Sequence, residues 1–287
     1  MFTTAEKRAL AQLSTAGGRL AVVAADQRGK MRAALSVAGI EPHIDTLRAI
    51  KRYLVTILGR EAPAMLLDPE IALPDVIDAG LLPSHTGLLV SVEVSGAPLR
   101  DGHRPAALLD RFGAAGVRRM GGTAAKLLVY VRGDHEGLDS HNARIVAEVA
   151  ADCAAHDLLL VVEGLVFPLE DEGPAQFAAR KPELVRETAL LLEAAGARYL
   201  KLECPGDERA CAAVTVALGI PGALLSAGVD HDTFVAQLRG ALAGGAAGFI
   251  AGRSIWKECV TMDGDARRAF LEGEGRRRLH ELLELVA

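Results

Sequence analysis

Short apolar segments rich in Val, Ile and Leu recur along the chain, and each is followed by a turn and then by a segment whose apolar residues have helical spacing. The apolar segments lie at 20–25, 64–67, 87–92, 125–131, 158–163, 199–203, 222–225 and 248–251. They are continuous rather than alternating, which is typical of parallel strands covered by helices. Eight such units give about 36 residues per unit, close to the size of an α/β protein with a (β/α)8 TIM barrel and extra helices.

Helices are predicted between and beyond these strands. Thr3 followed by Glu6 indicates a capping box for a short N-terminal helix that precedes the first strand and closes the bottom of the barrel. Longer helices are predicted at 141–155, 182–195 and 276–286. Pro182 suits the first turn of the second of these helices, and Gly196 suits its end.

The pattern predicts a single barrel domain that spans residues 1–287. No stretch rich in Pro, Gly and Ser is long enough to separate two domains. A doubly wound sheet is the competing architecture. Eight strands without a glycine-rich dinucleotide turn after the first favour the closed barrel.

Composition and charge narrow the class of protein. The chain has 32 Lys and Arg against 37 Asp and Glu, and its basic residues are scattered, so a nucleic-acid partner is not expected. Its apolar runs are far shorter than the roughly 18 residues of a membrane span, and its first residues lack the pattern of an export signal. Four cysteines without a C-x-x-C pair are too few for a disulfide framework. We therefore expect a cytoplasmic protein with no membrane partner.

The histidines do not indicate a metal site. All eight are widely spread and form no compact ligand motif, so we expect no metal cofactor. His43, His85 and His103 are interpreted as residues of solvated loops, as is the segment 134–136 together with His141.

One lysine stands out because it lies inside an apolar strand. Active sites of such barrels lie at the carboxyl ends of the strands, and Lys201 interrupts the apolar segment 199–203. Burial of an unpaired charge is too costly to be incidental. Lys201 therefore either loses its proton and becomes a nucleophile for carbonyl carbon, or forms an ion pair with Glu163 or Asp26 that only holds the strands in register. The sequence leaves both interpretations open.

Further candidates lie at the same end of the barrel. Lys126 places a second cation in the fourth segment, and the strand residues that follow it indicate that it starts low in the barrel and reaches upward. Glu163 ends the fifth segment, where an apolar environment can raise the pKa of a carboxyl towards neutrality for proton transfer, unless this residue merely neutralises a lysine. Asp26 and Gln27 end the first strand and suit sugar hydroxyls, unless Asp26 caps the next helix.

The last two strands are followed by residues suited to bind an anion. Ser226 and Gly228 follow the seventh segment, and Gly252 and Arg253 follow the eighth. Many barrels bind a phosphate at this place through loop amides and a helix N-terminus. An arginine adds a planar, permanently charged fork for oxyanions.

These features form a set of motifs in order along nearly the whole chain. The motifs are Ala24-Ala25-Asp26-Gln27-Arg28-Gly29, Lys126-Leu127-Leu128-Val129, Glu163, Tyr199-Leu200-Lys201-Leu202-Glu203-Cys204-Pro205, Leu225-Ser226-Ala227-Gly228-Val229-Asp230 and Ala251-Gly252-Arg253-Ser254-Ile255-Trp256. Together they resemble the class I aldolase family that contains tagatose-1,6-bisphosphate aldolase and sulfofructosephosphate aldolase.

This resemblance implies a (β/α)8 barrel and a covalent imine mechanism without a metal. Lys201 matches the family's Schiff-base position, and Glu163 matches its acid/base position. Asp26, Gln27 and Lys126 match other active-site positions.

The resemblance also implies an anionic sugar as substrate. Ser226, Gly228 and Arg253 match the positions that hold one anionic head group. Candidates for the other head group are Arg28, Lys30 and Arg32. The compact chain is nearer in length to the sulfofructosephosphate branch, and we predict cleavage of 6-deoxy-6-sulfofructose 1-phosphate to dihydroxyacetone phosphate and sulfolactaldehyde. Tagatose 1,6-bisphosphate, which gives glyceraldehyde 3-phosphate, is the alternative substrate. A non-catalytic barrel that senses a sugar phosphate stays open as a different class of function, and a homo-oligomer is compatible with the exposed barrel helices.

Overall fold

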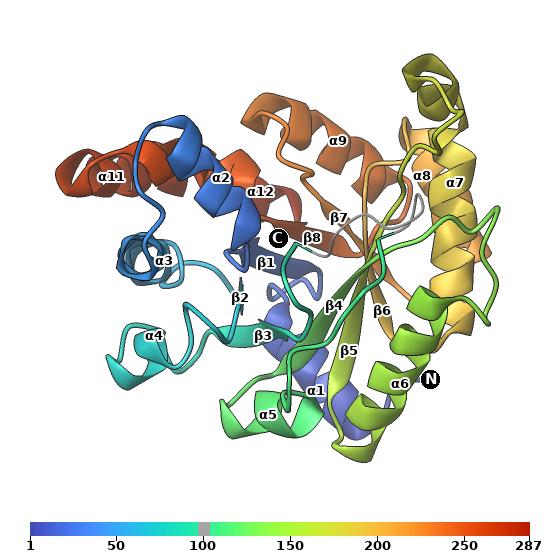
Figure 1. The fold of residues 1–287 in the computed structure, drawn as a ribbon, viewed down its shortest axis with the longest axis horizontal. Helices are drawn as coiled ribbons and strands as arrows, with labels where there is room; N and C mark the ends of the chain where they lie inside the picture. Colours follow the sequence, from blue (N-terminus) through green and yellow to red (C-terminus); the bar gives the residue numbers. More distant parts are fainter. Residues whose placement is uncertain (97–103) are drawn as a thin grey trace.

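The computed structural model describes residues 1–96 and 104–287 (Figure 1). Within them, eight parallel strands form one closed barrel in sequence order, and β1 is hydrogen-bonded to both β2 and β8. The strands are β1 (Leu20–Ala24), β2 (Ala64–Leu67), β3 (Gly87–Ser91), β4 (Ala124–Tyr130), β5 (Leu159–Leu165), β6 (Tyr199–Leu202), β7 (Gly222–Leu225) and β8 (Gly248–Ala251). The predicted (β/α)8 barrel is confirmed. His103 lies outside the described residues.

Helices surround the barrel (Figure 1). They are α1 (Thr4–Leu13), α2 (Gly29–Val37), α3 (Ile44–Ile57), α4 (Asp75–Asp78), α5 (Ala114–Arg119), α6 (His141–Ala155), α7 (Pro174–Ala194), α8 (Glu208–Ala217), α9 (His231–Ala243), α10 (Arg253–Trp256), α11 (Gly264–Phe270) and α12 (Arg276–Leu285), with a 3-10 turn at Lys257–Thr261 and a π turn at Leu271–Gly275. The helices α6 and α12 form where they were predicted. In the part of the chain that the structure describes, no helix is both long enough and apolar enough to cross a membrane.

The N-terminal helix begins with the predicted capping box. The backbone N–H of Thr3 donates to Glu6 Oε2 over 2.8 Å, and the backbone N–H of Glu6 donates to Thr3 Oγ1 over 3.2 Å. Ala9 and Leu13 of α1 are buried against the apolar residues inside the barrel. The predicted capping helix is confirmed, and α1 covers the end of the barrel at which the strands begin.

The predicted start of a helix at Pro182 is wrong. The helix α7 begins at Pro174 and has Pro182 in its interior. Residues 175–181 contain three Ala and one each of Gln, Arg and Lys, which favour a helix. Pro174 at the first turn already has the φ angle of a helix. These preferences extend the helix ahead of the interior proline. Its predicted end is confirmed, because the helix ends at Ala194 and Gly196 has a φ of 109°.

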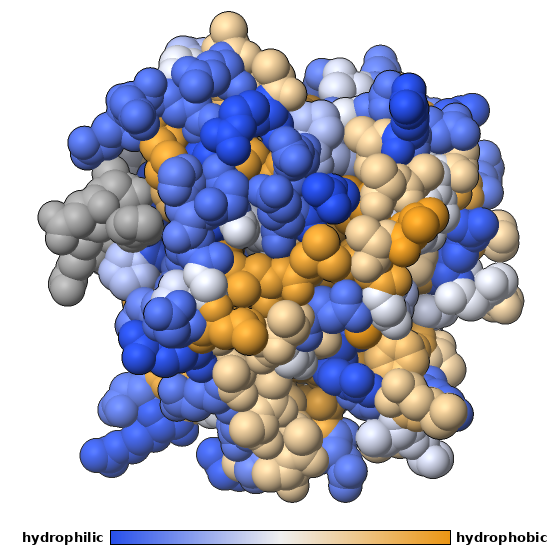
Figure 2. Space-filling model, turned by 90° about the vertical axis from the view of Figure 1, so that its right-hand side faces the viewer, coloured by the Kyte–Doolittle hydropathy of each residue, from blue (hydrophilic) through white to orange (hydrophobic). Residues whose placement is uncertain are grey.

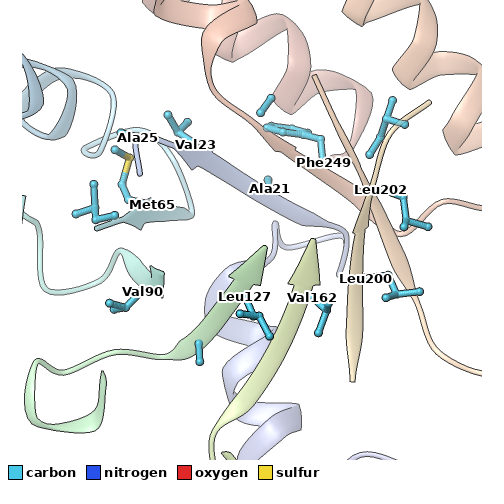
Figure 3. Close-up of a cluster of buried hydrophobic side chains, with 14 of the residues drawn as sticks. Ala21, Val23, Ala25, Met65, Val90, Leu127, Val162, Leu200, Leu202 and Phe249 are labelled. Carbon is cyan, nitrogen blue, oxygen red and sulfur yellow. The ribbon is translucent and has the colours of Figure 1, made fainter. Parts of the chain in front are cut away.

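Alternate residues of each strand face two different apolar regions. One set packs between the strands and the surrounding helices and includes Leu127 of β4 and Val162 of β5 (Figure 3). The other set fills the barrel interior and includes Ala124 of β4 and Val161 of β5. This interior set lies directly beneath the charged side chains of the candidate site, because successive side chains of a strand point to opposite faces.

The segment 134–136 is not a solvated loop throughout. The carboxylate of Asp134 is mostly buried and forms ion pairs with Arg132 over 2.9 Å and with Arg180 over 2.8 Å. Arg132 is fully buried and also contacts Glu172 over 2.7 Å. The prediction failed because the local sequence does not show that a buried guanidinium needs this carboxylate as its partner. The network joins the loops that follow β4 and β5.

The face that carries α6, α7 and α8 has an apolar strip between hydrophilic regions (Figure 2). A small groove of about 60 Å³ in this part of the molecule is lined mainly by apolar residues of α7, α8 and the neighbouring strands. None of the predicted site residues lines this groove. The candidate chemistry therefore lies elsewhere, at the carboxyl ends of the strands.

Candidate active site

Five charged side chains converge inside the carboxyl end of the barrel. They belong to Asp26, Glu93, Lys126, Glu163 and Lys201. In the register of the sheet, Glu163 of β5 lies between Leu128 of β4 and Lys201 of β6. Lys126 lies beside Val161, so it starts one inward-facing position lower in the barrel than Glu163. Each of the five charged residues is at least nine-tenths buried. The topology thus brings together four residues that were predicted from separate segments, Asp26, Lys126, Glu163 and Lys201, and adds Glu93 to them.

Lys126 is held by three carboxylates. Its Nζ lies 3.0 Å from Asp26 Oδ2, 2.8 Å from Glu93 Oε1 and 2.9 Å from Glu163 Oε2, so the predicted upward reach is confirmed. Burial by itself lowers the pKa of this amine, but the three negative charges outweigh burial and raise its pKa well above the ordinary range. Lys126 is therefore a fixed positive charge.

Among the described residues, no group of three or more His, Cys, Asp and Glu side chains is arranged to hold a metal ion.

Lys201 contacts one of the same carboxylates. Its Nζ donates to Glu163 Oε2 over 2.8 Å, so this single oxygen contacts both lysines. The side chain of Lys201 is 5% exposed and lines a cavity. Of the two partners expected for it, Glu163 forms the ion pair, and in the described part of the chain Asp26 does not.

The pKa of Glu163 is shifted in the direction opposite to the prediction. Burial by itself raises it, but the ammonium groups of Lys126 and Lys201 outweigh burial, and the pKa lies below its ordinary range. The sequence shows the apolar strand around this carboxyl but not the two lysines that reach it. Glu163 is therefore ionised in the site without substrate. It also lies inside β5 rather than at its end, because the strand continues to Leu165.

Asp26 and Gln27 line the cavity beside the two lysines. Burial raises the pKa of Asp26, but Lys126 and Lys201 outweigh burial and hold it well below its ordinary range. Asp26 does not cap α2, whose N-cap residue is Arg28. Within the described residues, Asp26 Oδ1 and Gln27 Oε1 have no hydrogen-bond partner, although both residues line the cavity. Both oxygens thus keep an unused acceptor at a buried position.

The cavity is large enough for a small-molecule ligand. It has a volume of about 410 Å³ and contains the five charged residues in its lining, together with Gln27, Arg28, Lys30, Ser95, Arg104, Tyr130 and Arg253. A second cavity of about 230 Å³ is also lined by Glu163, Lys201 and Arg253. A space of this size with convergent polar groups is typical of a binding site for a metabolite.

The loops after β7 and β8 meet at the predicted anion site. Arg253 Nη2 donates to the carbonyl oxygen of Ala227 over 3.0 Å. Gly228 has a φ of 88°, and a Cβ at this position would lie 2.8 Å from the Arg253 guanidinium, so a glycine is needed for this close approach. The second cavity, which Lys201 lines, includes Ser226, Gly252 and Arg253.

The three candidates for the other anionic end are Arg28, Lys30 and Arg32. The guanidinium of Arg28 is buried and donates to the carbonyl oxygen of Glu93 over 2.8 Å. Lys30 is exposed and lines both cavities. Arg32 donates to a backbone carbonyl over 2.6 Å and lines neither cavity. Arg28 and Lys30, but not Arg32, thus line a cavity of the candidate site.

Glu93 is a site residue that the sequence analysis missed. Besides its contact with the ammonium of Lys126, its carboxylate accepts the backbone N–H of Leu128 over 3.2 Å. Glu93 directly follows the apolar segment 87–92. The same position relative to a strand made Asp26 a candidate, so this signal was available in the sequence.

The chain matches the model of one protein family over most of its length. Residues 20–258 match the model described as DeoC/LacD family aldolase. Tagatose 1,6-diphosphate aldolase 2 of Enterococcus faecalis is 28% identical, with 100% of this chain and 95% of the relative covered. Tagatose 1,6-diphosphate aldolase 1 of Streptococcus mutans is also 28% identical, with 100% of this chain and 97% of the relative covered.

Solved structures share the fold over nearly the whole chain. A Schiff base forming fructose-1,6-bisphosphate aldolase superimposes with a TM-score of 0.67 at 17% identity and covers 98% of this chain and 99% of its own. An archaeal fructose-1,6-bisphosphate aldolase was solved with its catalytic Lys bound to a carbinolamine intermediate. It superimposes with a TM-score of 0.67 at 16% identity and covers 97% of this chain and 98% of its own. Both likenesses confirm the barrel.

The family match covers every charged residue of the site and both anion-site loops. It confirms the predicted family resemblance and the predicted class of enzyme. With a family model matched over residues 20–258, this chain belongs to the DeoC/LacD family of aldolases, which are lyases.

Proposed function

We propose that this protein is a class I aldolase that cleaves a phosphorylated ketose to dihydroxyacetone phosphate and an aldehyde through an imine on Lys201. The observation that carries the proposal is the position of Lys201 Nζ, which is buried, borders the cavity and lies 2.8 Å from Glu163 Oε2. A neutral amine at this place can attack a ketone, and the carboxylate can take the proton that the amine must lose.

The surroundings of the two lysines support Lys201 as the nucleophile. Lys126 contacts three carboxylates, and its pKa is raised well above the ordinary range despite burial. Lys201 forms one ion pair among the described residues, with Glu163. We therefore assign the reactive amine to Lys201 and a permanent positive charge to Lys126.

The first steps form the imine. Lys201 transfers a proton to Glu163 and attacks the C2 carbonyl carbon of the ketose. The resulting carbinolamine loses its hydroxyl group as water, with a proton returned by Glu163, and a protonated imine remains. The cationic imine keeps the positive charge that the carboxylate of Glu163 balanced at the start.

The next steps break the C3–C4 bond. Glu163, again ionised, accepts the proton of the C4 hydroxyl directly or through a water molecule, and C4 leaves as an aldehyde. The electron pair of the broken bond moves into the imine and forms an enamine. Protonation of the enamine at C3 and hydrolysis of the imine release dihydroxyacetone phosphate and restore Lys201. Asp26 and Gln27, which line the cavity, would hold hydroxyl groups of the sugar.

The anion site supports a phosphate on C1 of the ketose. Arg253 offers a guanidinium, and the turns after β7 and β8 offer backbone N–H groups, a combination that binds phosphate in many barrels. The residues assigned to this head group are Ser226, Gly228, Gly252 and Arg253.

The comparisons favour one ketose over the other. Two relatives that align with the whole of this chain are named tagatose 1,6-diphosphate aldolases, which supports tagatose 1,6-bisphosphate as substrate and glyceraldehyde 3-phosphate as product. The preference for 6-deoxy-6-sulfofructose 1-phosphate rested on the length of the chain, and we retain that sugar as the comparison substrate.

Trapping with borohydride tests the mechanism. Sodium borohydride reduces an imine to a stable secondary amine, so protein incubated with dihydroxyacetone phosphate should gain one adduct, which mass mapping should place on Lys201. Lys201→Ala should fold, gain no adduct and lose cleavage, whereas Lys7→Ala, at an exposed position of α1, should behave as the wild type. The imine mechanism needs no metal, so activity should survive a chelator. An unmodified wild-type protein, or cleavage by Lys201→Ala, would refute the proposal.

A substrate comparison tests the specificity. Cleavage should be compared for tagatose 1,6-bisphosphate, its C4 epimer fructose 1,6-bisphosphate and 6-deoxy-6-sulfofructose 1-phosphate. We expect the highest kcat/KM for tagatose 1,6-bisphosphate. A higher value for the sulfosugar would reverse this assignment, and binding without cleavage of any of the three would support the sensor instead.

A further inference from the structure

The chain returns to the mouth of the barrel after β3 along a defined path. The backbone N–H of Val94 donates to the carbonyl oxygen of Ala107 over 2.8 Å, and the N–H of Leu109 donates to the carbonyl oxygen of Val92 over 3.0 Å. Residues 104–109 therefore run beside the end of β3, where an isolated antiparallel bridge joins them to Glu93. Backbone hydrogen bonds hold this returning segment next to the candidate active site.

A buried amide at the start of α6 fixes the same segment from the other side. Asn142 Oδ1 accepts the backbone N–H of Ala106 over 2.7 Å, and Asn142 Nδ2 donates to the carbonyl oxygens of Arg104 and Tyr130, over 3.1 and 2.7 Å. The ring of His141 contacts the carbonyl oxygen of Ala106 over 2.9 Å. One side chain thus ties the backbone of Arg104 to the last residue of β4.

This arrangement places the exposed cation of Arg104 over an aromatic ring in the lining of the cavity. The Arg104 guanidinium lies 4.9 Å from the centre of the Tyr130 ring, a distance at which the face of the ring attracts a positive charge. Both side chains line the cavity that contains Lys201. In the described part of the chain, no carboxylate forms an ion pair with Arg104, so its charge is available to a ligand.

The topology sets Arg104 opposite the anion site of the last two loops. Arg253 follows β8 and Arg104 is held at the end of β4, and these strands lie across the ring in a barrel whose eight strands are paired in sequence order. Both arginines line the same cavity, and Lys201 belongs to β6, which lies between these two strands in the ring. A molecule that bears an anion at each end and a ketone between them matches this order.

We propose that Arg104, stacked on Tyr130, binds the anionic group at the C6 end of the ketose phosphate and determines the preference for doubly anionic substrates. The inference rests on the proposed aldolase function and assigns the second anionic end, for which the sequence offered Arg28, Lys30 and Arg32, to a residue outside the motifs. The planar fork of an arginine can donate two hydrogen bonds to a tetrahedral oxyanion. Phosphate and sulfonate share this geometry and differ in charge, so Arg104 serves either group, and a phosphate with nearly two negative charges gains more from it.

Removal of the charge tests the subsite. Arg104→Met and Arg104→Lys should be assayed with tagatose 1,6-bisphosphate, with 6-deoxy-6-sulfofructose 1-phosphate and with tagatose 1-phosphate, which has no anion at C6. We expect Arg104→Met to lower kcat/KM for the bisphosphate by about 10-fold to 100-fold, the range for hydrogen bonds to a charged group. Cleavage of tagatose 1-phosphate should change by less than about threefold. Arg104→Lys should restore part of the loss.

A matched control separates this role from a general effect of charge. Arg111 lies in the same loop, is 92% exposed and does not line the cavity, so Arg111→Met should leave all three substrates unchanged. Equal losses for the bisphosphate and the monophosphate in Arg104→Met, or no loss for either, would overturn the subsite.

Borohydride trapping with dihydroxyacetone phosphate distinguishes failure of the subsite from failure of the proposed function, because this compound lacks the C6 end. Arg104→Met should form as much adduct as the wild type. If the wild type itself forms none, the aldolase mechanism fails, and the subsite fails with it.

Discussion

Replacement of Lys126 by methionine should destabilise the fold, and the loss should depend on pH. Lys126 is 1% exposed, and its ammonium lies within 3.0 Å of three carboxylate oxygens. Methionine preserves most of the apolar stem but removes the charge. Asp26, Glu93 and Glu163 would then keep weaker compensation, because Lys201 contacts Glu163 and the Arg28 guanidinium lies 4.0 Å from Glu93 Oε1.

The size of the effect follows from the burial of the cluster. Removal of one partner from a buried ion pair typically costs about 3–5 kcal/mol, because the remaining charge is left without compensation. Three carboxylates lose a contact here, so we expect Lys126→Met to lose at least about 3 kcal/mol of unfolding free energy at pH 7.5. This is a large fraction of the roughly 5–15 kcal/mol that stabilises a typical domain.

The direction of the pH dependence follows from the two carboxyl pKa values. In the wild type, the pKa values of Asp26 and Glu163 lie below their ordinary ranges. The stability from these groups is therefore complete above the unfolded pKa, near 4, and is lost only as the pH falls through the lower folded values. In Lys126→Met, burial is opposed mainly by Lys201, so both pKa values should rise. A carboxyl whose folded pKa exceeds its unfolded pKa stabilises the fold as the pH falls.

Urea unfolding of the wild type, Lys126→Met and Lys7→Met at pH 7.5 and pH 5 measures this difference. The loss in Lys126→Met should be smaller at pH 5 than at pH 7.5. The exposed Lys7 variant should change by less than about 0.5 kcal/mol at either pH. A loss that is equal at both pH values, or larger at pH 5, would refute the reasoning, because Lys126 would then not be compensating ionised carboxylates.

Two further changes test other parts of the site. Gly228→Ala adds a Cβ at a φ of 88° against the Arg253 guanidinium, and it should raise KM for the ketose phosphate more than it lowers kcat. Gly18 has a φ of 79° and lies in open space, so the control Gly18→Ala should carry similar backbone strain without a change in KM. Equal changes of KM in both variants would count against the anion site. The neighbouring Cys211 thiol lowers the pKa of the Cys204 thiol to about 6 despite burial, and Cys204 is partly exposed whereas the other three cysteines are buried. Iodoacetamide at pH 7 should therefore alkylate Cys204 before the other cysteines, as peptide mass mapping would show. Faster alkylation of another cysteine would contradict this assignment.

The barrel could be predicted from the sequence because each strand is a local feature. The segments 64–67, 222–225 and 248–251 form strands with the bounds that their apolar runs indicate. The start of α7 could not be read in the same way. Pro182 is a local signal for a helix start, but the helix-favouring residues ahead of it extend α7 back to Pro174.

The site was predictable where a charge interrupts or ends an apolar run, as Lys126, Lys201 and Glu163 do. The pairing of these charges was not predictable, because it depends on the register between strands and on how far each lysine reaches. Arg104 gave no signal at all, since its place is set by Asn142, a residue of a different helix.

The ionised state of Glu163 changes the order of events in the proposed reaction. A carboxyl with a raised pKa, as the sequence indicates, would start as an acid and could first donate a proton to the substrate carbonyl. In the structure two ammonium groups lower the pKa of Glu163 despite its burial, so it starts as a base. Its Oε2 already accepts a hydrogen bond from Lys201. In the proposed reaction the first proton would therefore move from Lys201 to Glu163, and this single transfer would produce both the neutral amine that attacks the ketone and the acid that later removes the hydroxyl group as water.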